Sequence, residues 1–404
     1  MFLTKRKAED RSPWGDFFFT PVGKLSMSGA RVTPESALQL SAVYASVRVL
    51  SETIACLPIN IYRTGDKNKK PAKDHWLWPL LTRRPNRYQN PFEFKEMLQG
   101  HLALRGNAYC LMQFDRQGRI TELLPRHPDR VKIDLLDNGD YRFQIADQTG
   151  KWVPFAREEV WHLRGLSSDG IVGLSPMDIA REAVGLGLSA QSYGARFFQN
   201  DAKPTGGWIE FNGTFKDKTS REMFRESWQD AQAAMNRGRM AVLEHGMKYH
   251  EVGVTNDDAQ FLETRKFQTE EIARIFRVPP HLIGDLSRST FSNIEQQSID
   301  FATYTMTPWA ERWEASIEHQ LLLDSDEIEV SFDFRRLLRG DAGARASYYH
   351  NGILDGWMTR AEAREAEDLP PIDGLDEPLR PLNMVEESAA EVGETTTGTD
   401  DDET

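Results

Sequence analysis

Apolar residues recur every three or four positions in several stretches of this chain, the spacing that places side chains on one face of an α-helix. The first stretch begins after Thr33 and Pro34, which are favoured at a helix N-cap and in its first turn. A second begins at Asn90, with Glu93 as its capping-box partner, and is closed by Gly106. The sequence predicts two helices, the first with its apolar face at Leu40, Val43, Val47, Leu50 and Ile54.

Short apolar runs that alternate with polar turns predict strands in the same region. Residues 57–63 (LPINIYR) have the pattern of a strand. From NAYCLMQF at residue 107 to EEVWHLR at residue 164, further runs are separated by DRQG, DNGD and DQTG, whose Asp and Gly residues favour tight turns. We expect an antiparallel meander here. Together with the two helices it makes the first 165 residues an α+β region.

A long helix is predicted from Ser175, its N-cap, to Asp201. This helix contains glycine at 185, 187 and 194. Each glycine costs roughly 1 kcal/mol relative to alanine in a helix interior. We therefore expect these glycines where the helix packs closely against a neighbour.

A second long helix is predicted from Thr255, its N-cap, to Val278. Pro279 and Pro280 then end it abruptly, because proline lacks a backbone N–H and disfavours helical dihedrals in the preceding residue. The polar sequence GDLSRSTFSN follows. Residues 203–253, between the two long helices, predict a small α/β insert, so the middle of the chain is expected to form a stalk with a tip.

The sequence also predicts strands and helices in the insert and in the C-terminal third. The insert contains a strand (GGWIEF), a helix capped by Thr219 with Glu222, and a hairpin that turns at His245 and Gly246. After the prolines, Ser292 with Glu295 predicts a capping box, and Pro308 either kinks the helix that follows or starts a new one. A strand (EIEVSFDF) and a helical region from 335 to 369, with turns at GDAG and NGILDG, complete the pattern.

Charge and composition narrow the function classes. The net charge is -13, and residues 386–404 carry eight acidic and no basic residues, which predicts a disordered tail. The remaining chain carries about -5, whereas proteins that hold nucleic acid tightly have a positive excess. No run of 18 apolar residues occurs, so no membrane partner is expected. Cys56 and Cys110 are a thin basis for a disulfide framework, which favours synthesis in a reducing cytosol.

Motifs for catalysis and metal binding are incomplete. GLGLSA lacks the third glycine of a dinucleotide site, and GLSPM lacks the second glycine of a nucleophile elbow, so Ser175 is interpreted as a helix cap. His245 and His250 have no further ligand at metal-binding spacing. Asp257 and Asp258 lie at a predicted helix N-terminus, where acidic residues are favoured. We expect no enzymatic activity, no cofactor and no metal site.

Seven runs of sequence resemble, in their order and spacing, the portal protein (head–tail connector) family of tailed bacteriophages and related prophages. They are SAVYASVRVLSETIACLPINIY, HWLWPLLTRRPN, LALRGNAYCLMQFDRQGRITELLPRHPDRV, GIVGLSPMDIARE, FFQNDAKPTGG, IARIFRVPPHLIGD and SNIEQQSIDFATYTMTPW. The resemblance implies a structural protein, usually a ring of twelve copies at one capsid vertex. Double-stranded DNA passes through its channel during packaging by the terminase large subunit and during ejection. The head–tail adaptor and tail attach to it later.

The resemblance also implies a role in nucleating the procapsid with the major capsid protein and scaffold, in the host cytoplasm, and a final place in the virion. It implies the portal fold, with an α+β wing, a two-helix stem, a small α/β clip and a mainly helical crown. The segments are 1–32 (N-terminal arm), 33–183 (wing), 184–202 (stem), 203–254 (clip), 255–278 (stem), 279–292 (tunnel loop), 293–335 (wing, second part), 336–383 (crown) and 384–404 (acidic tail).

Three sets of residues carry the expected sites. The stem–loop junction is Val278, Pro279 and Pro280; the tunnel loop is Leu286, Ser287, Arg288, Ser289, Thr290 and Phe291; the clip surface for terminase or adaptor is Lys216, Lys218, Arg221, Arg225, Arg237 and Arg239. The loop's hydroxyls and Arg288 can meet phosphates, and Phe291 can wedge or pack against its neighbour. For each single residue, an ordinary surface loop between two helices is an equally good interpretation.

The net negative charge fits a channel through which DNA slides. Each contact between a basic side chain and a phosphate would add affinity and so oppose sliding. We expect weak DNA contact limited to the loop; tight, salt-sensitive binding of duplex DNA by the assembled ring would contradict this. Two other classes stay open. A nuclease would need a cluster of core carboxylates for metal, and a shell or adaptor subunit would assemble without a DNA channel.

Overall fold

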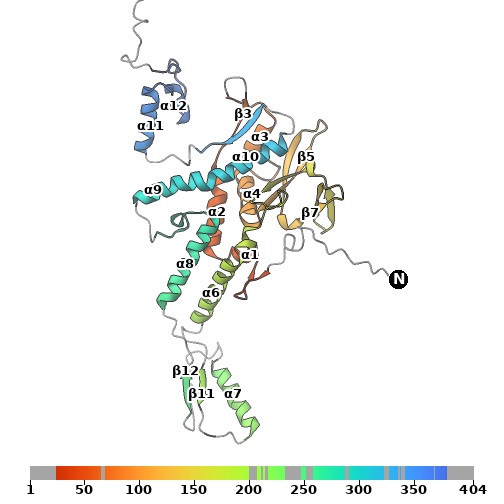
Figure 1. Ribbon diagram of the computed structural model, residues 1–404, viewed down its shortest axis with the longest axis vertical. Coiled ribbons are helices and arrows are strands. Elements are labelled where there is room, and N and C mark those ends of the chain that lie inside the picture. The colour runs from red at the N-terminus through yellow and green to blue at the C-terminus, as the bar shows by residue number, and fades with distance from the viewer. Residues whose placement is uncertain are drawn as a thin grey trace, which may run out of the picture. The chain divides into compact units, whose positions relative to one another are not determined.

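The computed structural model describes residues 24–64, 69–199, 207–210, 213, 217–232, 247–251, 258–286, 291–322, 327–334, 337, 342–367 and 369–379. The chain divides into two compact units, Met1–Phe334 and Arg335–Thr404. We describe each unit by itself, and Figure 1 labels their elements.

The first unit contains ten α-helices and thirteen strands among its described residues. The helices are α1 (Pro34–Ala37), α2 (Ser41–Cys56), α3 (Leu77–Thr82), α4 (Pro91–Arg105), α5 (Pro176–Ile179), α6 (Arg181–Gln199), α7 (Lys218–Gln232), α8 (Asp258–Phe276), α9 (Phe291–Asp300) and α10 (Thr307–Leu321). The strands are β1 (Lys24–Leu25), β2 (Arg31–Val32), β3 (Ile59–Thr64), β4 (Lys69–Pro71), β5 (Asn107–Phe114), β6 (Ile120–Arg126), β7 (Val131–Leu135), β8 (Tyr141–Ala146), β9 (Trp152–Phe155), β10 (Val160–Arg164), β11 (Gly207–Glu210), β12 (Lys248–Glu251) and β13 (Ile328–Phe332).

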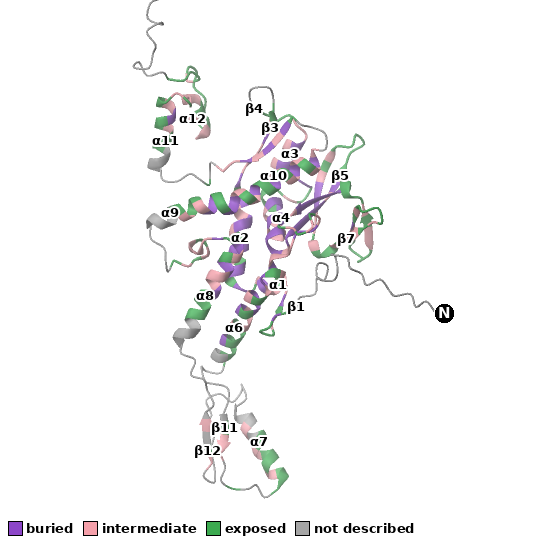
Figure 2. Cartoon of the chain, viewed as in Figure 1, coloured by how far each residue is buried: buried purple, intermediate pink, exposed green. Residues whose placement is uncertain are grey.

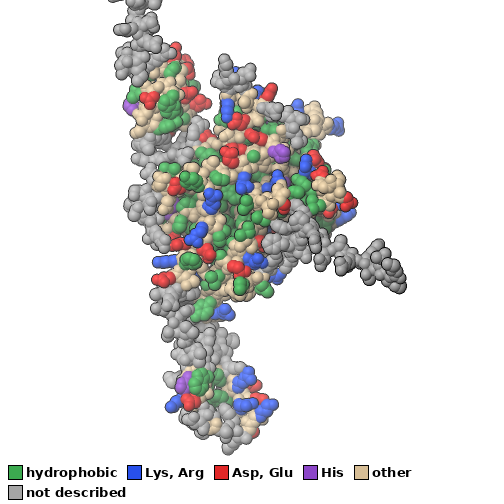
Figure 3. All heavy atoms as spheres, viewed as in Figure 1, with side chains coloured by type: hydrophobic (Ala, Val, Ile, Leu, Met, Phe, Trp, Pro, Cys, Tyr) green, Lys and Arg blue, Asp and Glu red, His purple; other side chains and the backbone are tan. Residues whose placement is uncertain are grey.

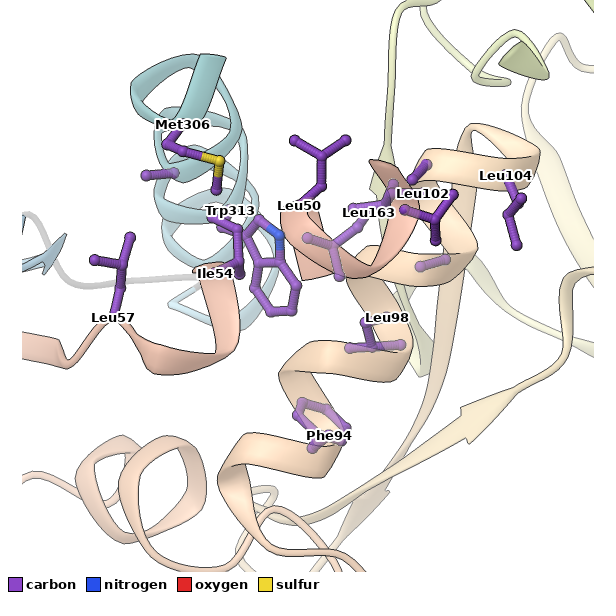
Figure 4. Packing of buried hydrophobic residues seen from close by; sticks show 14 of the residues in the cluster. Leu50, Ile54, Leu57, Phe94, Leu98, Leu102, Leu104, Leu163, Met306 and Trp313 are labelled. Carbon is purple, nitrogen blue, oxygen red and sulfur yellow. The ribbon is translucent and has the colours of Figure 1, made fainter. Parts of the chain in front are cut away.

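The main core lies where α2, α4 and α10 pack together with the sheets β13–β3–β4 and β10–β5–β6. Figure 2 shows buried residues concentrated on these elements, and Figure 4 shows Leu50, Ile54, Leu98 and Trp313 gathered at the centre. The apolar face predicted for the first helix is confirmed, since Val43, Val47, Leu50 and Ile54 are all buried.

That first helix is nevertheless two helices rather than one. Thr33 and Ser36 cap each other's backbone amides at the start of the short helix α1. Leu40 then has extended backbone dihedrals at the N-cap of α2, and its side chain is buried in the core. Leu40 is thus buried, as its place on the predicted apolar face implies, but the helical spacing did not indicate the break between the two helices. The second predicted helix, α4, has the expected Asn90–Glu93 capping box and left-handed Gly106.

The expected single meander is wrong, although all its strands are antiparallel. The strands instead form two sheets, β10–β5–β6 and β7–β8–β9, because β10 returns to pair with β5. Residues Val160–Leu163 of β10 are buried, and β10 packs against α10. A strand covered on both faces belongs in the core sheet, whereas β7–β9 contribute to a smaller cluster around Phe143 and Ile145.

The long helix predicted after Ser175 is also divided, into α5 and α6, at Ala180. Its glycines at 185 and 187 lie at close contacts, as expected. A Cβ on Gly185 would come within 2.3 Å of the Ser26 side chain, and one on Gly187 within 3.0 Å of Leu40. Ser26 belongs to the β1–β2 hairpin, which lies in the segment predicted as an N-terminal arm. This hairpin packs on α6 through the Met27 amide, which donates to Glu182 Oε2 (2.9 Å).

Of the two alternatives predicted for Pro308, the structure shows the second, because Pro308 lies in the first turn of a new α-helix, although the chain before it is helical too. A π-helical segment, η5 (Phe301–Met306), joins α9 directly to α10, and Pro308 is the second residue of α10. A proline in a regular helix clashes with the carbonyl four residues earlier and leaves it without a donor. The wider π-helical turn accommodates that change, and the Thr307 hydroxyl donates to the Ala302 carbonyl (3.0 Å).

The second unit contains α11 (Ala342–Leu354) and α12 (Arg360–Ala366). Helix α11 continues through Asn351 and Gly352, so the predicted turn at NGILDG begins later than expected. Gly352 lies against Trp357, where a Cβ would come within 2.8 Å of the indole ring. Residues of the predicted acidic tail, 384–404, lie outside the described residues.

Candidate functional site: the end of helix α8 and the unit between α6 and α8

Helix α8 ends in a Schellman motif just before the two prolines. The Arg277 amide donates to the Arg274 carbonyl (3.1 Å), and the Val278 amide donates to the Ala273 carbonyl (2.9 Å). Val278 is buried, and Pro279 and Pro280 are half-buried. A short 3-10 helix, η4 (Pro280–Ile283), follows and contacts α2. Helix α8 therefore ends at Phe276, two residues before the predicted Val278, and the two prolines follow the motif directly.

Arg277 occupies the position of the motif that glycine usually takes. Its φ is 56°, in the left-handed region that costs an L-residue about 1–2 kcal/mol. The Arg277 carbonyl accepts a hydrogen bond from the Thr305 hydroxyl of η5 (2.7 Å), which ties the strained residue to the π-helical segment. Backbone strain of this kind collects at functional sites. Sequence reasoning missed this residue, since an arginine two positions before a proline gives no indication of a positive φ.

A cleft of about 490 Å³ opens between α8, η4 and the α9–η5 junction. Its lining carries both charges, with Arg274 from α8, Arg277 just after this helix and Asp300 from α9. Tyr304 adds an exposed ring. At the η4 side, His281 Nδ1 lies 2.7 Å from Gln297 Oε1 of α9. A cleft of mixed charge suits polar contact with another macromolecular surface better than a small apolar ligand.

We expect Arg277→Gly to raise the free energy of unfolding by about 0.5–1 kcal/mol, because glycine adopts a positive φ without steric cost. Arg274→Gly, one turn earlier in regular helix, is the matched control and should lower it by about 1 kcal/mol. Urea denaturation of both variants measures the two changes. Equal losses in both would show that Arg277 is not strained.

The predicted loop residues are only partly described. Leu286 is 63% exposed. Ser287, Arg288, Ser289 and Thr290 lie outside the described residues. Helix α9 begins at Phe291, so Ser292 lies inside the helix and is not its N-cap.

The insert between α6 and α8, which is part of the first unit, contains the antiparallel strands β11 and β12 and helix α7. His250 stacks on Trp208 (ring centroids 4.3 Å apart), and its Nε2 lies 2.7 Å from Glu210 Oε2. These contacts explain His250 without a metal. The N-terminus of α7 is capped by Asp217, whose Oδ1 accepts from the Ser220 amide (2.7 Å), rather than by the predicted Thr219.

Three of the predicted clip residues form one basic stripe on α7. Lys218, Arg221 and Arg225 are exposed and follow one another at intervals of three and four residues, which places them on one helix face. Figure 3 shows Lys and Arg side chains gathered over α7. Lys216, Arg237 and Arg239 lie outside the described residues, as do His245 and Thr255.

Two of the runs that carried the family resemblance meet inside the core. The Asn107 Oδ1 accepts from the Gly173 amide (2.8 Å), and its Nδ2 donates to the Gly173 carbonyl (2.7 Å). His162 Nε2 lies 3.0 Å from the same Oδ1, and burial holds the pKa of His162 well below its ordinary value. Ser175 accepts from the Asp178 amide and caps α5, as predicted. The GLSPM motif is therefore a packing motif.

Among the residues that the structure describes, no group of three or more His, Cys, Asp or Glu side chains is placed to hold a metal ion. Within the same residues, no helix has the length and apolar character needed to cross a membrane.

Comparison with known proteins gives this arrangement a family. The family model "Phage portal protein" matches residues 41–368. The chain is 37% identical to a probable portal protein of Streptomyces phage phiC31 over 392 residues, covering 92% of this chain and 83% of the relative. It is 32% identical to the portal protein of Enterobacteria phage HK97 over 366 residues, covering 89% and 85%. The fold also matches a chain in the neck of a native GTA particle computed with C12 symmetry, with a TM-score of 0.55, 23% identity and coverage of 84% and 92%.

The fold and these relatives define a structural protein of the phage head, which forms the connection between head and tail in the virion. The chain belongs to the phage portal protein family. The predicted family and α+β fold class are thereby confirmed, and the family's role is structural rather than enzymatic.

Proposed function

We propose that this portal protein assembles into a closed ring of about twelve copies at one capsid vertex, with a central channel through which double-stranded DNA is packaged and ejected. The observation that carries the proposal is the family match, which spans 41–368 and so includes α6, α8 and the unit between them. The likeness to a neck chain computed with C12 symmetry supports the number twelve. Closed cyclic symmetry is the common solution for such assemblies.

The described elements suggest how the parts of this portal are arranged. Helices α6 and α8 contact each other and form the proposed stem. The β11–β12–α7 unit between them along the chain is the proposed clip. The α+β core up to α5, with α9 to β13, is the proposed wing, and α11–α12 belong to the proposed crown.

The end of α8 supports the proposed tunnel loop. The Schellman motif and the buried Val278 hold the start of the loop on the core, and Leu286, the last described residue before α9, is exposed. A chain that carries a net charge of -13 is suited to weak, loop-limited contact with DNA, because strong phosphate binding would oppose sliding.

The basic stripe on α7 is the proposed contact surface for the terminase large subunit and, after packaging, for the head–tail adaptor. Its three cations have only one ion pair among the described residues, between Lys218 and Glu222 at 4.0 Å. Exposed charges of this kind speed association with an oppositely charged surface. We place assembly with the major capsid protein and scaffold, and nucleation of the procapsid, in the host cytoplasm.

Charge reversal tests this assignment. The full chain with Lys218→Glu, Arg221→Glu and Arg225→Glu should keep the mass of the wild-type assembly and lose about tenfold or more in affinity for the terminase large subunit. The matched control reverses Arg116, Arg119 and Lys151, which are exposed in turns of the β5–β6 and β8–β9 hairpins.

Binding measured at two salt concentrations separates a charge effect from a fold defect, since only the former weakens with screening. Equal affinity for the α7 variant and the control variant would contradict a terminase contact on α7.

A further inference from the structure

One segment of the acidic chain is strongly basic. Residues 63–87 contain eight Lys or Arg and two Asp, so this segment carries +6 in a chain whose net charge is -13. It comprises the end of β3, strand β4, helix α3 and the start of the loop that leads to α4. A local positive excess attracts polyanions even where the net charge of the protein is negative.

The loop between α3 and α4, residues 83–90, presents three of these basic residues, and we call it the arginine loop. Arg83, Arg84 and Arg87 are exposed, and Tyr88 between them and α4 is 59% exposed. Neither Arg83 nor Arg84 has an ion pair with a residue that the structure describes. Arg87 lies 3.5 Å from Glu122 Oε2, and a long, partly exposed pair of this kind contributes little energy. The guanidinium groups are therefore free to bind another molecule.

Asn86 holds the arginine loop in one conformation. Its side chain is 2% exposed, and its Oδ1 accepts from the amides of Tyr88 (3.1 Å) and Gln89 (2.9 Å). Its Nδ2 donates to the Leu123 carbonyl of β6 (3.1 Å), and the Leu123 amide donates to the Pro85 carbonyl (2.8 Å). Because this backbone is already ordered, binding a partner costs little further conformational entropy there.

A fourth arginine approaches the arginine loop from β6. Burial raises the pKa of the Tyr88 hydroxyl, and the positive charges of Arg126 and Arg87 oppose that rise, so both guanidinium groups lie near it. Arg126 is the last residue of β6 and is half-buried. Arginine guanidinium groups and tyrosine hydroxyls are both donors to phosphate oxygens. The loop therefore gathers the side chains that contact a nucleic-acid backbone.

The length of the arginine loop also suits a nucleic-acid backbone. Consecutive Cα atoms are about 3.8 Å apart, so the Cα atoms of Arg83 and Arg87 lie within about 15 Å of each other. A strand of duplex DNA presents one phosphate for about every 3.4 Å along the helix axis, so about four phosphates fall within this span. An acidic protein surface would need several carboxylates in the same span, which repel one another. The spacing favours DNA.

We propose that the arginine loop, through Arg83, Arg84 and Arg87, binds the phosphate backbone of duplex DNA. This goes beyond the proposed function, which limits the weak DNA contact to the tunnel loop. The choice of DNA as the polyanion rests on the proposed function, whereas the contact itself needs only one chain and does not depend on the ring. With three or four phosphates bound, the affinity is expected in the weak range of non-specific binding, with Kd of about 10⁻⁶–10⁻⁴ M.

Charge reversal of the full chain tests the contact. Fluorescence anisotropy with a labelled duplex measures the affinity for DNA at about 50 and 200 mM salt. Arg83→Glu, Arg84→Glu and Arg87→Glu together should weaken binding about tenfold or more at the lower salt concentration. The slope of log affinity against log salt should fall by about 2.7, which is 0.9 for each of three lost phosphate contacts. Lysine at the same three positions keeps the charge and should keep most of that slope.

The matched control variant reverses three exposed charges elsewhere in the first unit. Lys132→Glu, Lys151→Glu and Arg157→Glu lie on or beside the sheet β7–β8–β9 and change the net charge by the same amount. Both variants should keep a thermal unfolding midpoint within a few degrees of the wild type. Equal losses of affinity and slope in the two variants would show that DNA responds only to net charge and would overturn the proposal, as would a wild type that binds no DNA.

Two further measurements separate this contact from its alternatives. Arg288→Glu, in the proposed tunnel loop, should lower the salt slope by only about 0.9. Binding lost in that variant and intact in the arginine-loop variant would place the contact in the tunnel loop alone. Poly-glutamate that competes as strongly as DNA of equal charge would point to an acidic protein partner instead. A monomeric wild type that still binds DNA through the arginine loop would contradict the ring but support this contact, which distinguishes the two failures.

Discussion

Replacing Gly106 with alanine is expected to destabilise the first unit by at least 3–4 kcal/mol, enough to prevent stable folding of many domains. Gly106 ends α4 with φ 70°, a conformation that disfavours any Cβ. An added Cβ would lie 2.0 Å from the Leu174 carbonyl oxygen. This oxygen belongs to the backbone, so a side-chain rotation cannot relieve the clash.

The surroundings of Gly106 leave little room for adjustment. The Gly106 carbonyl accepts from the Gly165 amide (2.7 Å), and Asn107 beside it holds both backbone groups of Gly173. Moving the backbone away from an added methyl would break these buried hydrogen bonds, each worth about 1 kcal/mol. The expected loss combines the left-handed penalty with this distortion.

Gly118→Ala is the matched control for Gly106→Ala. Gly118 has a similar φ of 79°, but a Cβ there would meet no atom within 4 Å. The variant should therefore lose only about 1 kcal/mol. Urea denaturation of both variants measures the difference, and equal losses at the two positions would show that the approach of residue 174 does not constrain the fold.

Trp313→Ala is expected to lower the free energy of unfolding by about 3–5 kcal/mol, the usual cost of removing a buried aromatic side chain. Trp313 is fully buried between α10, α2 and α4 (Figure 4). Its ring makes edge contacts with Trp161 (centroids 5.8 Å apart) and Phe332 (6.2 Å). The indole N–H donates to Gln99 Oε1 (2.9 Å).

Trp313→Phe separates the packing of this residue from its hydrogen bond. Phenylalanine keeps much of the apolar contact but leaves Gln99 Oε1 buried without its donor, at a cost of about 1–3 kcal/mol. The alanine variant should therefore be the less stable of the two in denaturant. A loss below about 1 kcal/mol for Trp313→Ala would contradict the central place of α10 in the core.

Local rules predicted the elements that depend on local chemistry. The Asn90–Glu93 capping box, the Ser175 cap and the apolar face of α2 need only neighbouring residues, and all three are confirmed. The close packing predicted from Gly185 and Gly187 is confirmed too, although the sequence did not show that the neighbours are Ser26 and Leu40.

Features set by long-range contacts were not predictable in the same way. The return of β10 to β5 depends on burial against α10, which no local spacing signals. The Thr305 hydroxyl donates to the Arg277 carbonyl. This tertiary hydrogen bond helps to hold both the π-helical segment before Pro308 and the positive φ of Arg277. Pro308 inside a helical pattern indicated an irregularity at this place, but not that the irregularity is a π-helical segment.

The candidate sites also divide into those that local spacing predicts and those that depend on contacts between distant segments. The structure places Lys218, Arg221 and Arg225 on one face of α7, which spacing alone suggests once the helix is known. The family resemblance, rather than any motif, pointed to the clip and the tunnel loop. The cleft beside Arg274 and Arg277 arises from segments distant in sequence and became visible only in the fold.

The mass of the purified assembly, measured together with negative-stain images, tests the central claim most directly. The proposed portal should have about twelve times the 46.1 kDa mass of one chain and appear as a ring with a central hole. A monomer or a twofold dimer, under conditions in which the chain is folded, would contradict a portal that assembles into a ring by its own contacts.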